Sequence, residues 1–341
     1  MIEGHGDDLY KYKYPIRINF SSNLTDWIDA TPLRLFLRER VGEVLSVYPE
    51  PRPFTLESRI ASHLHLLPDN VCVTNGATEA IYLIAQTFTG IRSAVFQPTF
   101  SEYADAARMY GHRVVSLYQW PAHGRLPEDL QMLWLCNPNN PTGQVQDKEA
   151  LALLVENNPQ VLFVIDQSYE DFTFKPLFSA CEAAKYPNVL LLHSLTKRYA
   201  MPGLRLGFLT GPAPLVAHLR THRMPWSVNG VALEAGLFLT EHPNAIPFDL
   251  SGCLKEKERL VSRLCAMGVF EVWDSDTHFF LVRLRMGHSS ALKDYLASEH
   301  GILIRDASNF EGLNEAFFRL SAQRKEDNDH LLEAMAQWLE S

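Results

Sequence analysis

The sequence contains no apolar stretch long enough to cross a membrane. Its 341 residues are 46% hydrophobic and 21% charged, but no run approaches the roughly 20 apolar residues that a spanning helix needs. The first residues, MIEGHGDDLYKYKY, also lack the apolar core of a secretory signal peptide. We therefore expect a globular cytoplasmic protein without a membrane partner.

Positive charge is also scarce. The chain carries 31 Lys and Arg against 40 Asp and Glu, which gives a formal net charge of -9 at pH 7. A surface that binds nucleic acid needs clustered positive charge, and the basic residues here are spread along the sequence. We therefore expect no nucleic-acid partner, and any anionic ligand must be bound by a few local groups.

Cysteine is sparse and shows no pairing pattern. The five cysteines are Cys72, Cys136, Cys181, Cys253 and Cys265. Their odd number and the lack of a C-x-x-C spacing indicate neither a disulfide framework nor a zinc site. His63 and His65 lie two apart in a predicted helix, where they point to nearly opposite sides and cannot share one ion. We expect no metal.

Hydrophobic periodicity alternates between strand-like and helix-like segments. The strand-like segments are SAVFQP, HRVVSL, LWLCNP, VLFVID, NVLLLHS and RLGFLTG, and helix-like examples are SEYADAARMYG and DKEALALLVENN. This alternation predicts an α/β fold whose mostly parallel sheet is covered by helices on both faces. From about Val231 the pattern changes to longer amphipathic helices and the β-rich segments HFFLVRLRM and GILIRD. We predict a large domain over 41–230 and a smaller α+β domain over 1–40 and 231–341.

Four predicted strand ends carry polar groups, and ligands of parallel sheets lie at the carboxyl ends of the strands. At the first, free N–H groups of Gly76, Ala77 and Thr78 could form an anion cradle at the start of a helix. An Asn-Gly turn before a helix is also common as plain packing. At the second, CNPNNPTG, Asn140 is either a turn residue or a rigidly held hydrogen-bond donor beside a cis Pro141.

The other two strand ends supply a carboxylate and a lysine. Asp166 ends the buried segment VLFVID and is followed by Tyr169. A buried carboxylate should face a cation or several donors, although a helix N-cap is the simpler explanation. The stretch HSLTKRYAMPGLRLG then offers Ser194, Lys197 and Arg205. A single lysine after a strand is usually a surface group.

The order of these groups along the chain is more specific than any one of them. An anion cradle is followed by Asn, Asp, Lys and Arg. NPNNPTG resembles the Asn-Pro-x-Gly loop of the fold-type I, pyridoxal-phosphate-dependent class I/II aminotransferases, and SLTKRYAMPGLRLG resembles their Ser-x-Ser/Thr-Lys, Gly-x-Arg-x-Gly signature. The resemblance extends from YPEP at Tyr48 to FFRLSAQRKEDN at Arg319. It implies a fold-type I transferase with pyridoxal 5'-phosphate as its cofactor.

The resemblance also implies a role for each matched residue. Lys197 would bond covalently to the cofactor aldehyde and later carry a proton at the substrate carbon. Asp166 would pair with the protonated ring nitrogen, Asn140 and Tyr169 would hydrogen-bond the phenolic oxygen, and Phe100 would stack on the ring. The groups implied for the cofactor phosphate are those of Gly76, Ala77, Thr78, Ser194 and Arg205. Tyr48 resembles a tyrosine that reaches the partner's cofactor, which implies a homodimer with shared active sites.

Two groups of the family compete for the activity, the threonine-phosphate decarboxylases of cobalamin biosynthesis and the histidinol-phosphate aminotransferases. Both act on small phosphorylated amino acids or amines, so both need a second anion site, for which Arg305 and Arg319 are candidates. By resemblance to the decarboxylases, His5 and Asn23 would approach the substrate phosphate. The segments RMPWSVN, ILIRDASNFEGL and NFSSN favour the decarboxylase group.

Some residues depart from the relatives. Asp7 stands where the decarboxylases have glycine, and Tyr169 where they more often have Phe, so the aminotransferase alternative stays open. Gln167, directly after Asp166, replaces a usual acidic residue. A third class, a non-catalytic cofactor-binding regulator, would be expected to carry a DNA-binding segment, and the sequence has no region left for one. We favour L-threonine O-3-phosphate decarboxylation.

Overall fold

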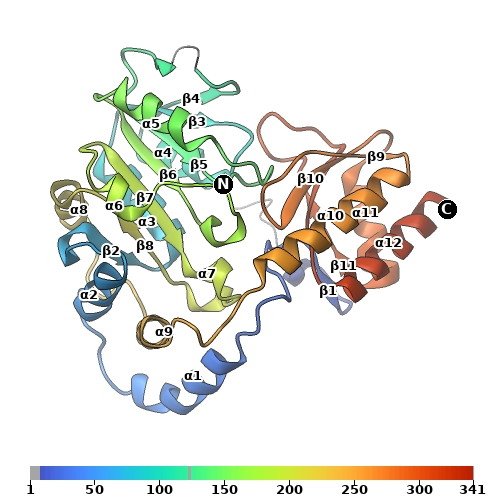
Figure 1. The fold of residues 1–341 in the computed structure, drawn as a ribbon, viewed down its shortest axis with the longest axis horizontal. Coiled ribbons are helices and arrows are strands. Elements are labelled where there is room, and N and C mark those ends of the chain that lie inside the picture. Colours follow the sequence, from blue (N-terminus) through green and yellow to red (C-terminus); the bar gives the residue numbers. More distant parts are fainter. Residues whose placement is uncertain (1–7, 122–123, 341) are drawn as a thin grey trace.

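The computed structural model describes residues 8–121 and 124–340, which form two β-sheet regions side by side (Figure 1). Within these residues the larger sheet has seven strands. In spatial order they are β2 (Val71–Thr74), β8 (Gly207–Thr210), β7 (Val189–Ser194), β6 (Leu162–Asp166), β5 (Met132–Cys136), β3 (Arg92–Phe96) and β4 (Arg113–Leu117). β8 runs antiparallel to both neighbours and the other pairs are parallel. The predicted α/β fold with a mostly parallel sheet is confirmed.

Helices cover both faces of this sheet, which explains why its central strands are apolar along their whole length. The helices α3 (Gly76–Thr87), α4 (Glu102–Met109) and α8 (Ala213–Arg220) pack on one face. The helices α5 (Lys148–Glu156) and α6 (Ala180–Ala183) pack on the other. Within β6, Leu162 and Val164 pack in the cluster that includes α3, α4 and α8. Phe163 and Ile165 pack in the cluster on the opposite face, which includes α5 and α6.

The C-terminal part of the chain forms a second layer. An antiparallel sheet has the strand order β12 (Arg305–Asp306), β13 (Phe317–Ser321), β10 (Phe279–Leu284) and β9 (Phe270–Val272). Against it pack the helices α10 (Leu250–Ala266), α11 (Ser289–His300) and α12 (Lys325–Glu340), at the right of Figure 1. The short strand β1 (Ile18–Asn19) pairs in parallel with β11 (Ile302–Leu303). The N-terminal segment therefore joins the C-terminal region in space.

Three helices pack together near the β2 edge of the large sheet (Figure 1). The helix α9 (Gly230–Glu241) packs against α1 (Thr31–Val44) and α2 (Phe54–His63), and α2 packs against β2. Phe36 of α1 stacks on Phe238 of α9 with ring centroids 4.7 Å apart. The predicted domain boundary near residue 231 falls at the start of α9, and the division into 41–230 and the two flanking segments stays a prediction. No helix in 8–121 or 124–340 has the length and apolar character that crossing a membrane requires.

Candidate active site

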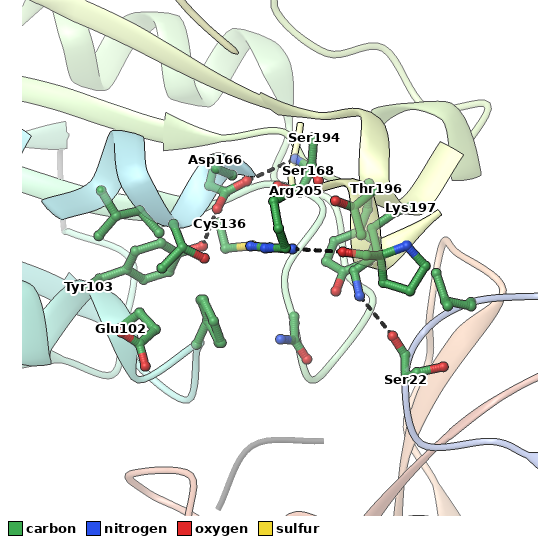
Figure 2. A pocket seen from close by; sticks show the side chains of 18 of the residues that line it. Ser22, Glu102, Tyr103, Cys136, Asp166, Ser168, Ser194, Thr196, Lys197 and Arg205 are labelled. Carbon is green, nitrogen blue, oxygen red and sulfur yellow. Dashed lines mark hydrogen bonds between the residues drawn. The ribbon is translucent and has the colours of Figure 1, made fainter. Parts of the chain in front are cut away.

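The polar strand ends meet at one edge of the large sheet. The strands β2, β5, β6 and β7 point the same way, so their carboxyl ends share this edge, and antiparallel β8 brings its amino end there too. A cavity of about 520 Å³ opens at this edge (Figure 2). The residues expected at the site that line it are Ala77, Thr78, Phe100, Asn140, Asp166, Tyr169, Ser194, Lys197, Arg205 and Arg319.

The start of α3 and Arg205 together form the anion cradle. The helix begins at Gly76, directly after β2, so the first N–H groups of α3 have no partner within the helix. Gly76 has a φ of +80°, and a Cβ placed on it would lie 2.7 Å from Arg205 Nη2. The guanidinium therefore lies against the helix N-terminus, and its Nη1 donates to the Pro202 carbonyl at 3.3 Å. The partial positive charge of the α3 N-terminus and the full positive charge of Arg205 therefore lie side by side, an arrangement that suits a phosphate group.

Gly207, the first residue of β8, allows this cradle to close. A Cβ on Gly207 would lie 2.8 Å from Ala77 N and 2.9 Å from Gly76 C, both backbone atoms of the cradle. We expect Gly207→Ala to push α3 away from Arg205 and to weaken binding of pyridoxal phosphate to the apoprotein by about tenfold or more, the loss of one charge-assisted contact. Titration of apoprotein with the cofactor measures this affinity.

Gly203 offers the matched control, because a Cβ on it meets nothing within 4 Å. Gly203→Ala lies in the same connection between β7 and β8 and should keep the wild-type affinity. Equal affinities for the two alanine variants would show that the close approach at Gly207 does not shape the cradle.

Asp166 ends β6 as a buried carboxylate with two donors. Its Oδ2 accepts a hydrogen bond from Tyr103 OH at 2.7 Å, and its Oδ1 accepts one from Ser168 N at 2.8 Å. Burial nevertheless raises the pKa of Asp166 above its usual value, because the two hydrogen bonds only partly offset the loss of solvent. A cationic group placed beside this carboxylate would restore its charged form, as the protonated ring nitrogen of the cofactor would.

Lys197 lies on α7 (Leu195–Arg198), the single turn of helix that follows β7. Its Nζ donates to the Ser22 carbonyl at 2.8 Å, which ties the lysine to the segment after β1. Figure 2 shows Lys197 and Asp166 on opposite sides of Arg205 around the same cavity. An amine and a buried carboxylate therefore border one space, with the anion cradle between them.

Arg319 connects the second layer to the cavity. Its Nη1 donates to Asn140 Oδ1 and its Nη2 to the Ser21 carbonyl, whereas its Nε is buried with no partner among the described residues. Tyr169 OH accepts a hydrogen bond from Asn23 Nδ2 at 3.0 Å. Burial lowers the pKa of Arg319 to about 9 and raises that of Tyr169 to about 12. An anion beside Arg319 would remove the cost of burying its charge.

Arg305 lies directly opposite Arg319 in the β12–β13 pairing. The two arginines line a small side cavity of about 40 Å³ together with Phe100 and Asn140, which also border the main cavity. Arg305 Nη2 donates to Asn309 Oδ1 at 2.8 Å. Burial lowers the pKa of Arg305 to about 10. Two buried guanidinium groups therefore border a small space beside the main cavity.

Not every expected residue lies at the cavity wall. Asn23 is buried behind Tyr169 with its Oδ1 unpaired among the described residues, and Tyr48 is 90% exposed on the surface, where it packs against Trp226. Gln167 points away, because its Nε2 donates to the Phe178 carbonyl at 3.1 Å. His5, like Asp7, lies outside the described residues.

The sequence did not indicate several residues that the structure places at the cavity. Tyr103 holds Asp166, and Ser22, Glu102, Cys136 and Thr196 also line the wall. The sequence did carry a signal for Ser168. Aspartate side chains often accept a hydrogen bond from the backbone N–H two residues later and so form a turn, as Asp166 does with Ser168 N. Tyr103 had no such signal, because its reach to Asp166 depends on how α4 packs on the sheet.

A wound α/β sheet with a lysine, a buried carboxylate and an anion cradle at its carboxyl edge defines a pyridoxal-phosphate-dependent enzyme of fold type I. The chemistry of these donors fits the aldehyde, the ring nitrogen and the phosphate of that cofactor. The sequence matches the aminotransferase class I and II family over residues 15–335. The chain belongs to this family, and its cofactor is pyridoxal 5'-phosphate.

Relatives with two different activities resemble the chain over most of its length. The crystal structure of an L-threonine-O-3-phosphate decarboxylase from Porphyromonas gingivalis is 34% identical, with a TM-score of 0.91 over 95% of this chain and 100% of that one. A threonine-phosphate decarboxylase of Salmonella typhimurium is 26% identical over 93% of this chain and 90% of its own. A histidinol-phosphate aminotransferase of Thermoanaerobacter pseudethanolicus is 28% identical over 86% of this chain and 85% of its own.

Proposed function

We propose that the chain decarboxylates L-threonine O-3-phosphate, as a step of cobalamin biosynthesis. The observation that carries the proposal is the likeness to the Porphyromonas gingivalis decarboxylase, which combines 34% identity with a TM-score of 0.91. The buried pair Arg305 and Arg319 supports it, because a substrate that carries a phosphate needs an anion site separate from the cofactor cradle. In the net reaction the bond to the carboxylate carbon breaks, carbon dioxide leaves and a proton takes its place.

The proposal assigns a contact with the cofactor to residues around the cavity. The first turn of α3, Ser194 and Arg205 would bind its phosphate, and Asp166 would hold the proton on its ring nitrogen. Asn140 and Tyr169 would contact its phenolic oxygen, and Phe100, which lines the cavity, would pack on its ring face. Tyr103 fixes Asp166 from behind through its hydroxyl.

The bound cofactor supplies an aldehyde for an amine and a conjugated ring that accepts the electron pair of a bond broken at the adjacent carbon. Lys197, which lines the same cavity, would provide the amine that anchors the cofactor and would then carry the proton at the reacting carbon. Asp166 keeps the ring nitrogen protonated, which maintains the electron-accepting character of the ring.

The two arginines determine which bond breaks. The bond that lies perpendicular to the ring plane is the one whose electrons can enter the ring, so orientation of the substrate selects the reaction. A substrate phosphate bound by Arg305 and Arg319 would turn the carboxylate to that perpendicular direction, with the binding energy of the phosphate offsetting the lost freedom. Asn23, which was expected to approach the substrate phosphate, is buried and lines neither cavity, so in this proposal it would instead position the Tyr169 hydroxyl, to which its Nδ2 donates.

Histidinol-phosphate aminotransferase is the second candidate function, supported by the 28% identity to the Thermoanaerobacter pseudethanolicus enzyme and by Tyr169. We expect purified protein to release carbon dioxide from L-threonine O-3-phosphate and to transaminate histidinol phosphate with 2-oxoglutarate only slowly. Measuring both reactions on one preparation decides between them. Efficient transamination without release of carbon dioxide would establish the aminotransferase instead.

The proposal includes a homodimer with shared active sites. Tyr48 is 90% exposed and packs against Trp226, which is 50% exposed, and the neighbouring Val47 is 65% exposed. Such a patch is typical of a surface that another subunit covers. We also place the enzyme in the cytoplasm, in keeping with five cysteines that are all free thiols.

A further inference from the structure

The loop 307–316 connects β12 and β13 and crosses from the second layer to the edge of the large sheet. At its tip Glu311 accepts hydrogen bonds from three residues of that edge. Its Oε1 accepts from Ser116 Oγ and from Tyr118 OH at 3.0 Å, and its Oε2 accepts from Gln97 Nε2 at 3.3 Å. Arg108 Nη2 lies 3.8 Å from the same carboxylate. One exposed side chain therefore joins the loop to β4, to the end of β3 and to α4.

The preceding residues of the same loop hold Arg305. Asn309 Oδ1 accepts from Arg305 Nη2 at 2.8 Å, and the Phe310 ring lies 5.0 Å from the guanidinium carbon. Asn309 and Phe310 line the small cavity with Arg305 and Arg319. The contact that fixes the loop and the contacts that orient the guanidinium are thus neighbours in the sequence, at 311 and at 309–310.

We propose that Glu311 is a positioning residue for the second anion site. Its contacts with Ser116 and Tyr118 hold the loop 307–316 against the large sheet, and the held loop fixes the Arg305 guanidinium toward the side cavity. Glu311 itself lines neither the main cavity nor the side cavity. The identification of the bound anion as a substrate phosphate rests on the proposed function, whereas the coupling between Glu311 and Arg305 rests on the contacts alone.

The geometry favours a specific role of Glu311 in fixing the loop 307–316 over a general contribution to the stability of the fold. A single exposed ion pair contributes little, but Glu311 gathers three hydrogen bonds and an arginine on one carboxylate. The loop also has its own small core, in which Ala307, Phe310 and Leu313 pack with Leu281 and Phe317. Loss of Glu311 should therefore release the loop from the sheet edge without unfolding it. Binding an anion would then have to order the loop again, which lowers affinity.

The experiment compares Glu311→Ala with Glu315→Ala in the holoenzyme. Glu315 is exposed in the same loop, and its side chain has no hydrogen bond or ion pair with another described residue. Three properties are measured: amide hydrogen exchange over 307–313, the affinity for inorganic phosphate as a competitor of the phosphorylated substrate, and the KM and kcat for that substrate. Tyr118→Phe removes one contact from the opposite side and serves as a second variant.

In Glu311→Ala we expect faster exchange over 307–313 and about tenfold weaker phosphate binding. KM for the phosphorylated substrate should rise while kcat changes little, since no group at the reacting carbon is altered. Glu315→Ala should match the wild type. Tyr118→Phe should weaken phosphate binding less, and its effect should largely disappear when Glu311 is already alanine.

Two results would overturn the inference. Unchanged phosphate affinity in Glu311→Ala, with faster loop exchange, would show that the contacts of Glu311 fix the loop without affecting anion binding at Arg305. Equal effects of Glu311→Ala and Glu315→Ala would reduce the role of Glu311 to its charge. Failure of the proposed function has a different signature, because the wild-type enzyme itself would then fail to release carbon dioxide while the exchange difference over 307–313 remained.

Discussion

Lys197→Ala should lose at least about 10²–10⁴-fold in turnover, the range for removal of a positioned proton-transfer group. The cofactor also loses its covalent anchor, because Lys197 Nζ is the amine that borders the cavity next to the cradle. Borohydride reduction of wild-type holoenzyme should fix the cofactor on the peptide that contains Lys197, and the alanine variant should release it on denaturation. A label recovered on another lysine would refute the assignment.

Mixed dimers extend the same test to the shared site. Tyr48→Ala and Lys197→Ala chains should each be severely impaired as homodimers. Co-expressed, they should recover part of the activity, because one of the two sites in each mixed dimer would hold both wild-type groups. Verified mixed dimers without recovery would place the whole site within one chain.

Asp166→Asn is the second change with a large expected effect, a loss on the order of 10²–10⁴-fold in turnover. Asparagine has nearly the same shape but no charge, so it cannot hold the proton on the ring nitrogen. The apoprotein should stay folded, with an unfolding free energy within about 1 kcal/mol of wild type for the change in its hydrogen bonds to Tyr103 and Ser168. Near-normal turnover of the folded variant would contradict the role of Asp166.

The pH dependence of apoprotein stability gives this prediction its control. Burial raises the pKa of Asp166 in the folded chain. The stability contributed by its protonated form is complete below the pKa of the unfolded chain and is lost as the pH rises through the raised value. Above about pH 4, wild-type apoprotein should therefore lose stability relative to Asp166→Asn, which lacks this titration. Chemical denaturation of the two apoproteins across pH measures the difference.

Local sequence patterns predicted the features that depend on neighbours along the chain. Buried apolar runs predicted the parallel strands, and their polar ends predicted which segments border one edge. The resemblance then predicted Lys197, Asp166 and Arg205 as a set, and the structure places all three at one cavity. Their roles toward the cofactor stay predictions.

Features that depend on the packing of distant segments could not be read in this way. The antiparallel direction of β8 has no signature in GFLT, since its four residues would suit a strand of either direction. Tyr103 reaches Asp166 and Glu311 reaches Tyr118 only after helices and loops have docked. Tyr48 is the opposite case: the resemblance predicted its role, but the contact it is expected to make is with a second subunit, which a single chain does not contain.

The position of β8 between β2 and β7 has a consequence for the order of assembly. The strand β2 comes early in the large domain and β8 at its end, so their pairing closes a very long loop of chain at a considerable entropic cost. Gly207 meets the backbone of Gly76 and Ala77 only when that pairing exists. A nascent or partly refolded chain therefore has no phosphate cradle. The cofactor should stabilise the folded protein by mass action without guiding its early folding, and its binding during refolding should report the formation of the β2–β8 pair.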